Sequence, residues 1–226
     1  MAKPGAPRNH TRDEILDAAQ AMLKEHGSEN FSVRALAKNV GLSPMGLYTY
    51  FPSRESILAA VLERFSLPLG IAPVPGEYWD ETVKRITGSL LEVVQAHPQT
   101  MRINYDLRNS WARAQYKSLY LIHRDQGMPD SSYAHLYCGV TSFLAGFFNG
   151  RMQSASLLEQ LEAKKREADS WEQIVLSSFT DTAYTRGIEM LLQAVRKHSA
   201  PDPCEWRTPE NPEEWTWTAP TETALQ

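Results

Sequence analysis

A four-residue run near the N-terminus, GLSP at residues 41–44, determines how two neighbouring helices can be joined. Gly41 stands where the chain must turn, and glycine adopts the positive φ that such a turn requires without steric cost. Ser43 followed by Pro44 is typical of an N-cap followed by the first helical residue. The run therefore predicts a tight turn with a helix beginning at about Pro44.

Apolar residues at helical spacing place this turn inside a small all-helical domain. The predicted helices are Thr11 to about His26, a very short helix that opens at Ser32 and ends at Gly41, a short helix from about Pro44, and Arg54 to about Ser66. In the third of them, Leu47 and Phe51 stand four residues apart and face inward. Two short helices joined by a glycine turn make a helix-turn-helix.

The length and composition are those of a folded protein. The chain has 226 residues, of which 42% are hydrophobic and 10% aromatic, which is enough apolar surface for a packed core. No apolar run approaches the roughly 18 residues of a membrane-spanning helix, and the N-terminus has no apolar signal-peptide block. We therefore expect the protein in the cytosol, where a bridge between Cys138 and Cys204 is disfavoured.

The net charge of −4 is unevenly distributed along the chain. Residues 1–65 carry 8 Lys and Arg against 7 Asp and Glu, residues 66–200 carry 14 against 14, and residues 201–226 carry 1 against 6. The acidity therefore belongs mainly to the tail. Lys3, Arg8 and Arg12 precede the first acidic residue and form a short cationic arm. Such an arm is suited to DNA phosphates, but composition alone fits a solvated, mobile terminus equally well.

The outward face of the helix from Pro44 has the features of a DNA-reading helix. Its N-terminal end carries slim residues that can enter a major groove, and the hydroxyls of Tyr48 and Tyr50 can bond to phosphate oxygens. Gly46 in mid-helix costs roughly 1 kcal/mol relative to alanine, which suggests that something bulky approaches closely. The alternative is that Gly46 accommodates a neighbouring helix and that the tyrosines belong to the rim of the small core.

The run FSVRALAKNVGLSPMGLYTYFPSRESIL, residues 31–58, resembles the DNA-binding domain of the TetR family of bacterial transcriptional regulators. The matching features are Ser32, Leu36-Ala37, Gly41-Leu42-Ser43, Leu47-Tyr48, Tyr50-Phe51 and Ser53-Arg54-Glu55. The resemblance implies an all-α fold. A three-helix helix-turn-helix domain is joined through a fourth helix to a larger helical domain for ligand binding and dimerisation. It also implies a cytoplasmic, nucleoid-associated repressor of double-stranded DNA operators, without enzymatic activity or cofactor.

The resemblance assigns two kinds of DNA contact to positions in this chain. Phosphates would be held by Ser32, Arg34, Tyr48, Tyr50 and Arg54, the last standing where many relatives carry lysine. Base edges would be met from the positions of Ser43, Pro44, Met45 and Thr49. Many relatives have Gly-Thr or a similar small pair where this chain has Met45-Gly46, so no particular base preference carries over. Met45 has no hydrogen-bond donor and can read only a thymine methyl group or local shape.

Beyond residue 66 the pattern stays helical. The predicted helices are 80–97, about 99–107, 109–126, 130–154 and 171–198, and they follow the proline- and glycine-rich connector LPLGIAPVPGEYW. The charged segment 157–171 is either a helical extension or a loop. The predicted division is an N-terminal domain over 1–66 with its motif at about 32–51, a helical domain over 67–200, and an acidic Pro/Trp-rich tail over 201–226.

Two of these helices have the pattern of an association surface. The helix over 130–154 carries a broad apolar face with Gly139, Gly146 and Gly150 as sites of close approach, and the helix over 171–198 carries a second apolar stripe. In the family such late helices pair across a two-fold axis, but periodicity also allows both stripes to be intrachain core. One short recognition helix reads few base pairs, so we predict a homodimer on a pseudo-palindromic operator.

The family also implies a pocket for a small organic effector, walled by the helices around residues 80–152. The candidate lining residues are Tyr105, Arg108, Trp111, Tyr120, His123 and Phe147. Each has a plain structural alternative, since Arg108 and His123 can be surface residues and aromatic side chains commonly fill cores. Effector binding would move the fourth helix, change the separation of the paired recognition helices and weaken operator binding.

Catalytic motifs are absent from the sequence. It has no glycine-rich phosphate loop, nucleophile elbow or HExxH helix, so we predict no catalytic site. His135 and Cys138 stand three apart, a spacing compatible with two metal ligands, but without further ligands we predict no metal site. Two alternative functions from other classes are a helical ligand-binding dimer that has lost DNA binding and an enzyme hidden in the helical domain.

The tail either straps across its own or the partner's helical domain through Trp206, Trp215 and Trp217, or is disordered.

Overall fold

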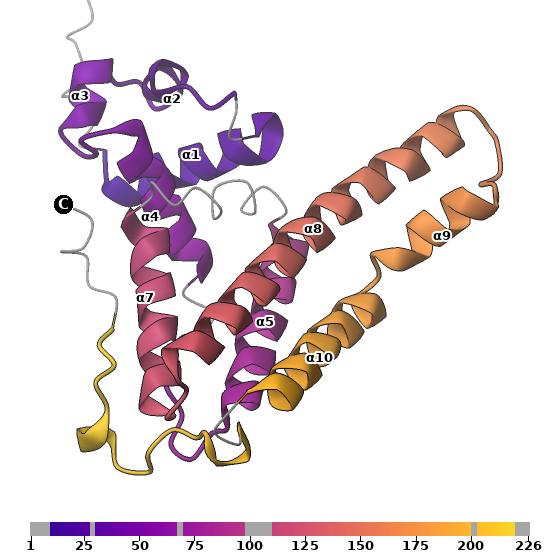
Figure 1. Cartoon of the computed structure of the whole chain (residues 1–226). Helices are drawn as coiled ribbons and strands as arrows, with labels where there is room; N and C mark the ends of the chain where they lie inside the picture. The colour runs from indigo at the N-terminus through magenta and orange to yellow at the C-terminus, as the bar shows by residue number, and fades with distance from the viewer. Residues whose placement is uncertain (1–9, 28–29, 67–69, 98–109, 200–202, 220–226) are drawn as a thin grey trace, which may run out of the picture. The chain divides into compact units, whose positions relative to one another are not determined.

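The computed structural model describes residues 10–27, 30–66, 70–97, 110–199 and 203–219 (Figure 1). In this part of the chain the regular structure is helical, apart from one isolated β-bridge between Tyr78 and Arg207. The predicted all-α fold is confirmed. None of the described helices is long and apolar enough to cross a membrane.

The described residues form two compact units. The first holds residues 10–27, 30–66, 70, 89–97 and 110–115, and the second holds 71–88, 116–199 and 203–219. The predicted domain boundaries at residues 66 and 200 stay predictions.

The helices are labelled as in Figure 1. They are α1 (Arg12–His26), α2 (Val33–Asn39), α3 (Pro44–Tyr48), α4 (Arg54–Ser66), α5 (Trp79–Ala96), α7 (Ser110–Asp125), α8 (Asp130–Ala163), α9 (Ser170–Ser178), α10 (Asp181–His198), and the 3-10 turns η2 (Pro203–Glu205) and η3 (Pro212–Glu214). The bounds of α1 to α5 and of α7 agree with the prediction to within a few residues. The predicted helix over 99–107 lies outside the described residues.

The predicted end of α8 at residue 154 is wrong. Helix α8 continues to Ala163 because residues 155–163 are mostly strong helix formers and Leu161 is buried. It ends where Lys165 takes a positive φ of 48° and the Arg166 amide donates to the Leu161 carbonyl at 3.0 Å. The charged segment is thus partly helical extension and partly turn.

The single helix predicted over 171–198 is also wrong, because two helices, α9 and α10, occupy this range. The break falls at Phe179 and Thr180. The Thr180 hydroxyl accepts a hydrogen bond from the Ala183 amide at 3.3 Å and so caps a new helix. Helix α9 has its own cap, a capping box between Asp169 and Glu172.

Helices α1 to α4 form the core of the first unit. Its buried members are mainly aliphatic, with Phe31 and Phe51 as the aromatic ones: Ile15, Leu16, Ala19, Met22, Leu23, Phe31, Leu36, Ala37, Leu47, Phe51, Ile57, Leu58, Val61 and Leu62. An ion pair between Arg64 and Asp17, at 2.7 Å, joins α4 to α1 on the surface. The sequence-predicted inward positions, Leu47 and Phe51, are both completely buried.

Helices α8 and α10 pack side by side in the second unit, and glycines bring them close (Figure 1). A Cβ at Gly187 would lie 2.3 Å from the Phe143 ring, and one at Gly150 would lie 2.2 Å from the Phe179 ring. Tyr184 is buried between them and donates a hydrogen bond of 2.7 Å to the Thr87 carbonyl of α5. Much of both predicted apolar stripes is therefore intrachain core.

The tail over residues 203–219 forms a strap along its own second unit, which confirms one of the alternatives for this segment (Figure 1). At its inner end Trp206 is 3% exposed and meets Trp79 edge to face, with ring centroids 6.0 Å apart. The Trp79 indole donates to the Pro203 carbonyl and the Trp79 amide to the Trp206 carbonyl, both at 3.0 Å. These contacts fix the strap to the start of α5.

The outer end of the strap is fixed to α7. The Asp125 carboxylate accepts from the amides of Thr216 and Trp217 at 2.8 and 2.9 Å, and the Thr216 hydroxyl contacts the same carboxylate. The Trp217 indole donates to the hydroxyl of the buried Ser118 at 2.5 Å. The strap therefore ties the end of α7 to the beginning of α5.

Candidate functional site

The turn before α3 is built as the sequence predicts. Gly41 has a φ of +74°, and the Leu42 amide donates to the Ala37 carbonyl at 2.8 Å. The Ser43 hydroxyl accepts from the Gly46 amide at 3.0 Å, and Pro44 takes the first helical position. This geometry fixes the direction in which α3 leaves the turn.

Helix α3 is anchored on one side and bare on the other. Leu47 and Phe51 are 0% exposed, whereas Met45 is 77% exposed and Tyr48 is 43% exposed. The Met45 side chain is therefore available for an apolar contact with a partner outside the chain. Around it Ser43, Pro44 and Thr49 are exposed and Tyr50 is half-buried. The predicted base-reading positions thus share one accessible end of the helix.

Gly46 has room for a side chain. A Cβ there would meet Ser43 Oγ at 3.4 Å and Leu42 Cδ2 at 3.7 Å, which are ordinary contacts with the preceding turn. The nearest atoms therefore belong to the turn and not to a neighbouring helix. Packing among the described residues gives no reason for a glycine at this position.

The predicted phosphate-binding side chains have different surroundings. Ser32 is exposed, and its oxygen accepts from the Ala35 amide at 3.4 Å, which leaves the hydroxyl proton free to donate. Arg34 is exposed on α2, and within the described residues no ion pair is formed by it. Arg54 instead turns inward, with Nε donating to the Phe31 carbonyl at 3.4 Å and the guanidinium 6.0 Å from the Phe31 ring.

The cationic arm is only partly described. Arg12 begins α1 with its guanidinium 4.6 Å from the centre of the Phe51 ring, a cation–π contact. Lys3 and Arg8 lie outside the described residues. So do Tyr105 and Arg108 of the predicted effector pocket and the side chain of Trp111.

The three described effector candidates do not form one cluster. Tyr120 and His123 lie on α7 and both adjoin Tyr133 of α8, at ring-centroid distances of 5.2 and 5.7 Å. Phe147 lies in another aromatic cluster, whose members are Phe143, Phe148, Phe179 and Tyr184. The structure thus brings two of the three together.

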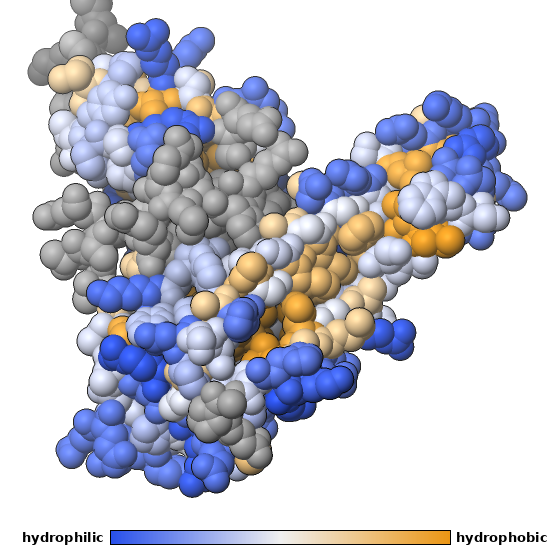
Figure 2. Space-filling view, viewed as in Figure 1, coloured by the Kyte–Doolittle hydropathy of each residue, from blue (hydrophilic) through white to orange (hydrophobic). Residues whose placement is uncertain are grey.

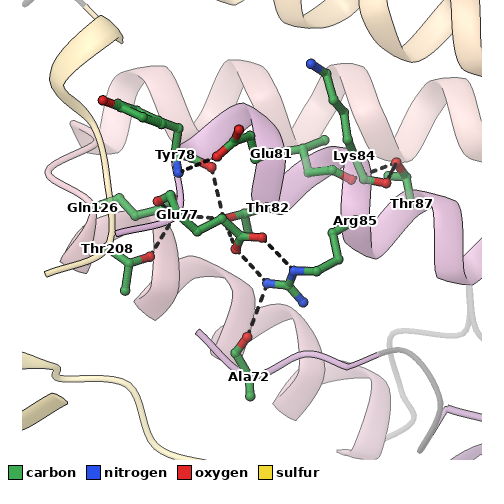
Figure 3. Close-up of polar contacts among 11 residues, drawn as sticks. Ala72, Glu77, Tyr78, Glu81, Thr82, Lys84, Arg85, Thr87, Gln126 and Thr208 are labelled. Atoms are coloured by element: carbon green, nitrogen blue, oxygen red, sulfur yellow. Dashed lines mark hydrogen bonds and ion pairs between the residues drawn. The ribbon is translucent and has the colours of Figure 1, made fainter. Parts of the chain in front are cut away.

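A buried polar network is centred on Gln126 (Figure 3), which also contacts His123. Gln126 donates to Thr82 Oγ1 at 2.7 Å, to Thr208 Oγ1 at 3.1 Å and to the Glu77 carbonyl at 3.2 Å. His123 Nδ1 lies 2.9 Å from Gln126 Oε1. Burial lowers the pKa of His123 to about 4, although Gln126 and Glu77 act in the opposite direction. The imidazole is therefore neutral at neutral pH.

Glu77 and Arg85 form the charged end of this network (Figure 3). Arg85 Nε donates to Glu77 Oε1 at 2.7 Å and Nη2 to Oε2 at 2.7 Å, a bidentate pair. Burial alone would raise the pKa of Glu77, but the hydrogen bonds from Arg85 and Thr82 outweigh it and lower that pKa. Sequence reasoning missed Thr82, Gln126 and Thr208, because they lie far apart in the chain and belong to no local motif.

A groove of about 310 Å³ runs between α8 and α10. Its lining residues are mostly apolar, with one imidazole from each helix: His135, Leu136, Gly139, Leu191, Ala194, Val195, His198 and Ser199. Figure 2 shows apolar side chains gathered over α8 and α10, between more hydrophilic ends. Of the three α8 glycines singled out above, Gly139 and Gly150 have Leu191 and Phe179 against them, whereas Gly146 has nothing within 4 Å.

The residues with catalytic or metal-binding potential are dispersed. Cys138 and Cys204 are both exposed. In the described ranges no group of three or more His, Cys, Asp and Glu side chains could hold a metal ion.

Comparison with known proteins places the α1–α4 region in a family of regulators. The family model for bacterial regulatory proteins of the tetR family matches residues 15–61. The HTH-type transcriptional repressor DrrR1 of Streptomyces coeruleorubidus is 25% identical over 169 residues, covering 71% of this chain and 60% of that protein. The curated relatives compared are matched over 60% of their own length or less, under two thirds.

Solved structures share the fold over most of the chain. BioQ of Mycobacterium smegmatis has a TM-score of 0.61 at 19% identity, covering 84% of this chain and 99% of BioQ. BioQ with its double-stranded DNA operator has a TM-score of 0.54 at 16% identity, with the same coverage. ActR of Streptomyces coelicolor with actinorhodin has a TM-score of 0.57 at 20% identity, covering 86% of this chain and all of ActR. At these identities the likeness shows the fold.

Proposed function

The chain belongs to the TetR family of bacterial regulatory proteins, and we propose that it represses transcription by binding a pseudo-palindromic DNA operator as a homodimer. The observation that carries this proposal is α3, whose buried Leu47 and Phe51 hold Met45 and Tyr48 outward on a bare helix end. We place the protein in the cytosol with DNA and assign it no catalytic activity. BioQ, which shares the fold, is solved on a DNA operator.

In this proposal α3 enters the major groove and its exposed N-terminal end meets base edges. Ser43, Pro44 and Thr49 are small enough to let the helix approach, and Met45 contributes an apolar contact to a thymine methyl group or to groove shape. The proton of the Ser43 hydroxyl is free to donate, because the oxygen already accepts from Gly46. The contacts of α3 with base edges are therefore few and partly apolar.

Phosphate contacts from α2, α3 and the start of α4 would hold the helix in register. We assign them to Ser32, Arg34, Tyr48, Tyr50 and Arg54, with Lys3, Arg8 and Arg12 of the arm as further cations. Arg34 is the most accessible of the described cations in this set, since Arg54 and Arg12 lie on Phe31 and Phe51. Contact by Arg54 requires it to leave the Phe31 carbonyl or to approach DNA from that position.

Dimerisation is proposed through α8 and α10, in place of the predicted ranges 130–154 and 171–198. The buried stripes are used within one chain, so the surface left for a second copy is the groove between the helices together with Gly146 and the exposed Met190. A bare methionine beside an apolar groove on the same face suits an isologous two-fold contact, in which each copy supplies both features. Of the three glycines predicted as sites of close approach, Gly139 lines the groove, whereas Gly150 has the Phe179 ring against it.

A small organic effector is proposed to release the operator. Tyr120 and His123, around Tyr133, are the described residues that we assign to its site, with Tyr105, Arg108, Trp111 and Phe147 kept as predictions. ActR, which shares the fold, is solved with actinorhodin. An effector shifts operator binding only if it binds the two states of the regulator with different affinity.

Selection from random DNA tests the proposal. We expect full-length protein at physiological salt to enrich a pseudo-palindrome, and we expect Tyr50→Ala to enrich it about tenfold less because a phosphate contact is lost. Salt matters because phosphate contacts weaken as salt rises. Enrichment of a single half-site would refute the dimer. Absence of any motif would refute operator binding and leave the helical ligand-binding dimer as the reading.

A glycine-to-alanine change at residue 46 separates folding from DNA binding. We expect Gly46→Ala to keep or raise the free energy of unfolding by up to about 1 kcal/mol, because the added Cβ has room and alanine favours helix. We expect the same variant to bind the selected operator several-fold more weakly, because the methyl group blocks close approach of DNA. Denaturant unfolding and a fluorescence titration with labelled operator measure the two effects. Unchanged operator affinity would mean that α3 does not approach DNA at Gly46.

A further inference from the structure

The hydrogen bonds of Gln126 decide which nitrogen of His123 carries a proton. The two N–H groups of Gln126 face three oxygens, those of the Thr82 and Thr208 hydroxyls and of the Glu77 carbonyl (Figure 3). The Glu77 carbonyl only accepts and the Thr82 hydroxyl donates its proton to Glu77 Oε2, so the end of Gln126 that faces them is the amide nitrogen and the other end is the carbonyl oxygen. That oxygen faces His123 Nδ1 at 2.9 Å and can only accept. Nδ1 of His123 therefore bears the hydrogen.

The other ring nitrogen, His123 Nε2, is then a buried acceptor. The side chain is 4% exposed, and its burial keeps the imidazole neutral, so Nε2 carries a lone pair. Among the described residues no group donates a hydrogen bond to it. Buried polar atoms in native proteins are nearly always paired, so Nε2 requires a partner beyond the described residues.

Aromatic side chains of α7 and α8 lie beside the His123 ring. Tyr133 adjoins His123, Tyr120 meets Tyr133 edge to face, and Tyr133 stacks on Tyr137 at 6.1 Å. Burial raises the pKa of the Tyr116 phenol to about 12 and also raises that of Tyr133, so both stay neutral. Burial that disfavours charge on phenols disfavours charge on a ligand as well.

The nearby charges are already engaged. The Arg124 guanidinium lies 5.8 Å from the Tyr120 ring centre and donates to the Thr216 hydroxyl at 2.5 Å. Asp130 accepts from the Tyr120 hydroxyl at 3.0 Å. An anionic ligand would thus find no uncommitted cation among these residues, and it would bring a second acceptor to His123 Nε2.

We propose that His123 Nε2 is the hydrogen-bond acceptor of the effector site, and that the effector is an uncharged aromatic molecule that donates a hydroxyl or N–H group to it. The inference rests on the proposed effector response and names its chemistry. Gln126 is a positioning residue in this site, because it acts on the ligand only by fixing the proton on Nδ1. The donor group of the effector gives the buried Nε2 a hydrogen bond, and the aromatic ring of the effector packs against the tyrosines.

A matched pair of probes tests the ligand class. The probes are 2-naphthol and 2-methoxynaphthalene, which share the aromatic rings and differ in the hydroxyl proton. We expect full-length protein to bind the naphthol about tenfold more tightly in a calorimetric titration, which is the effect of one hydrogen bond of about 1.4 kcal/mol. His123→Phe should bind both probes equally, and His26→Phe, which removes a half-exposed imidazole of α1, should keep the preference.

Three results would overturn the proposal: equal affinity of the two probes for the parent, the same preference in His123→Phe, or binding of neither probe. A second measurement tests the position of the proton on His123 directly and requires no ligand binding by the parent or the variant. In ¹⁵N-histidine spectra of the parent, the signal missing from His123→Phe should be that of a ring protonated at Nδ1 only, and a proton on Nε2 would refute the assignment. Operator selection involves neither probe, so failure here would leave DNA binding unaffected.

Discussion

Replacing Trp206 by alanine is expected to lower the free energy of unfolding by about 3–5 kcal/mol, the range found for truncating a buried tryptophan. The indole is 3% exposed and packs edge to face on Trp79, so its removal leaves a cavity at the start of α5. The loss also loosens the segment whose carbonyl accepts from the Trp79 amide. Denaturant unfolding followed by circular dichroism measures the change, at one fixed protein concentration because dimerisation would contribute to stability.

Trp171 provides the matched control for this substitution. It is the same residue type in the same unit, on α9, but it is 69% exposed. Trp171→Ala is therefore expected to change the free energy of unfolding by less than about 0.5 kcal/mol. If Trp206→Ala cost no more than Trp171→Ala, the strap would not be part of the folded core.

The strap gives the acidic tail a structural role. Its inner end holds the start of α5 through Trp206 and Thr208, and its outer end holds α7 through Thr216 and Trp217. Thr208 also reaches Gln126, which fixes the tautomer of His123. The tail therefore supports the side chain that we assign to effector binding, although it lies more than eighty residues away in sequence.

The helix-turn-helix could be predicted because its signals are local. Gly41, Ser43 and Pro44 act within one turn of chain, and the spacing of Leu47 and Phe51 alone decides which side of α3 is buried. Each of these preferences depends on a few neighbouring residues, so neither the helices nor their order required tertiary information. The resemblance of the same run to a known family added the expected roles.

Other features depend on contacts between distant residues and could not be read from a pattern. The break between α9 and α10 coincides with Phe179, whose ring lies against Gly150 of α8. Phe147 and Tyr120 were candidates for one effector pocket, but no sequence pattern assigns them to the different aromatic clusters in which they lie. His123 was a candidate for the effector site only because of the chemistry of its side chain. No sequence motif points to its hydrogen-bond partner Gln126.

The neutral state of His123 makes stability depend on pH, and the sign follows from the two pKa values. The ordinary value of 6.5 applies to the unfolded chain, and burial lowers the folded pKa to about 4. Between these values the unfolded state binds a proton that the folded state does not. The stabilisation is therefore complete above pH 6.5 and is lost as the pH falls toward 4. The pKa of Glu77 is also lower in the folded state than its ordinary value, so Glu77 too contributes stability that is lost as the pH falls.

Acidification from pH 6.5 to pH 4 is accordingly expected to remove about 3 kcal/mol of unfolding free energy through His123, at about 1.4 kcal/mol per pH unit. His123→Phe should flatten this part of the profile, because phenylalanine binds no proton in either state. The slope is the readout and not the stability at one pH, since the variant also leaves the Gln126 carbonyl without its donor. Denaturant unfolding at half-unit pH steps measures both profiles, and a slope retained in His123→Phe would mean that other groups take up the acid protons.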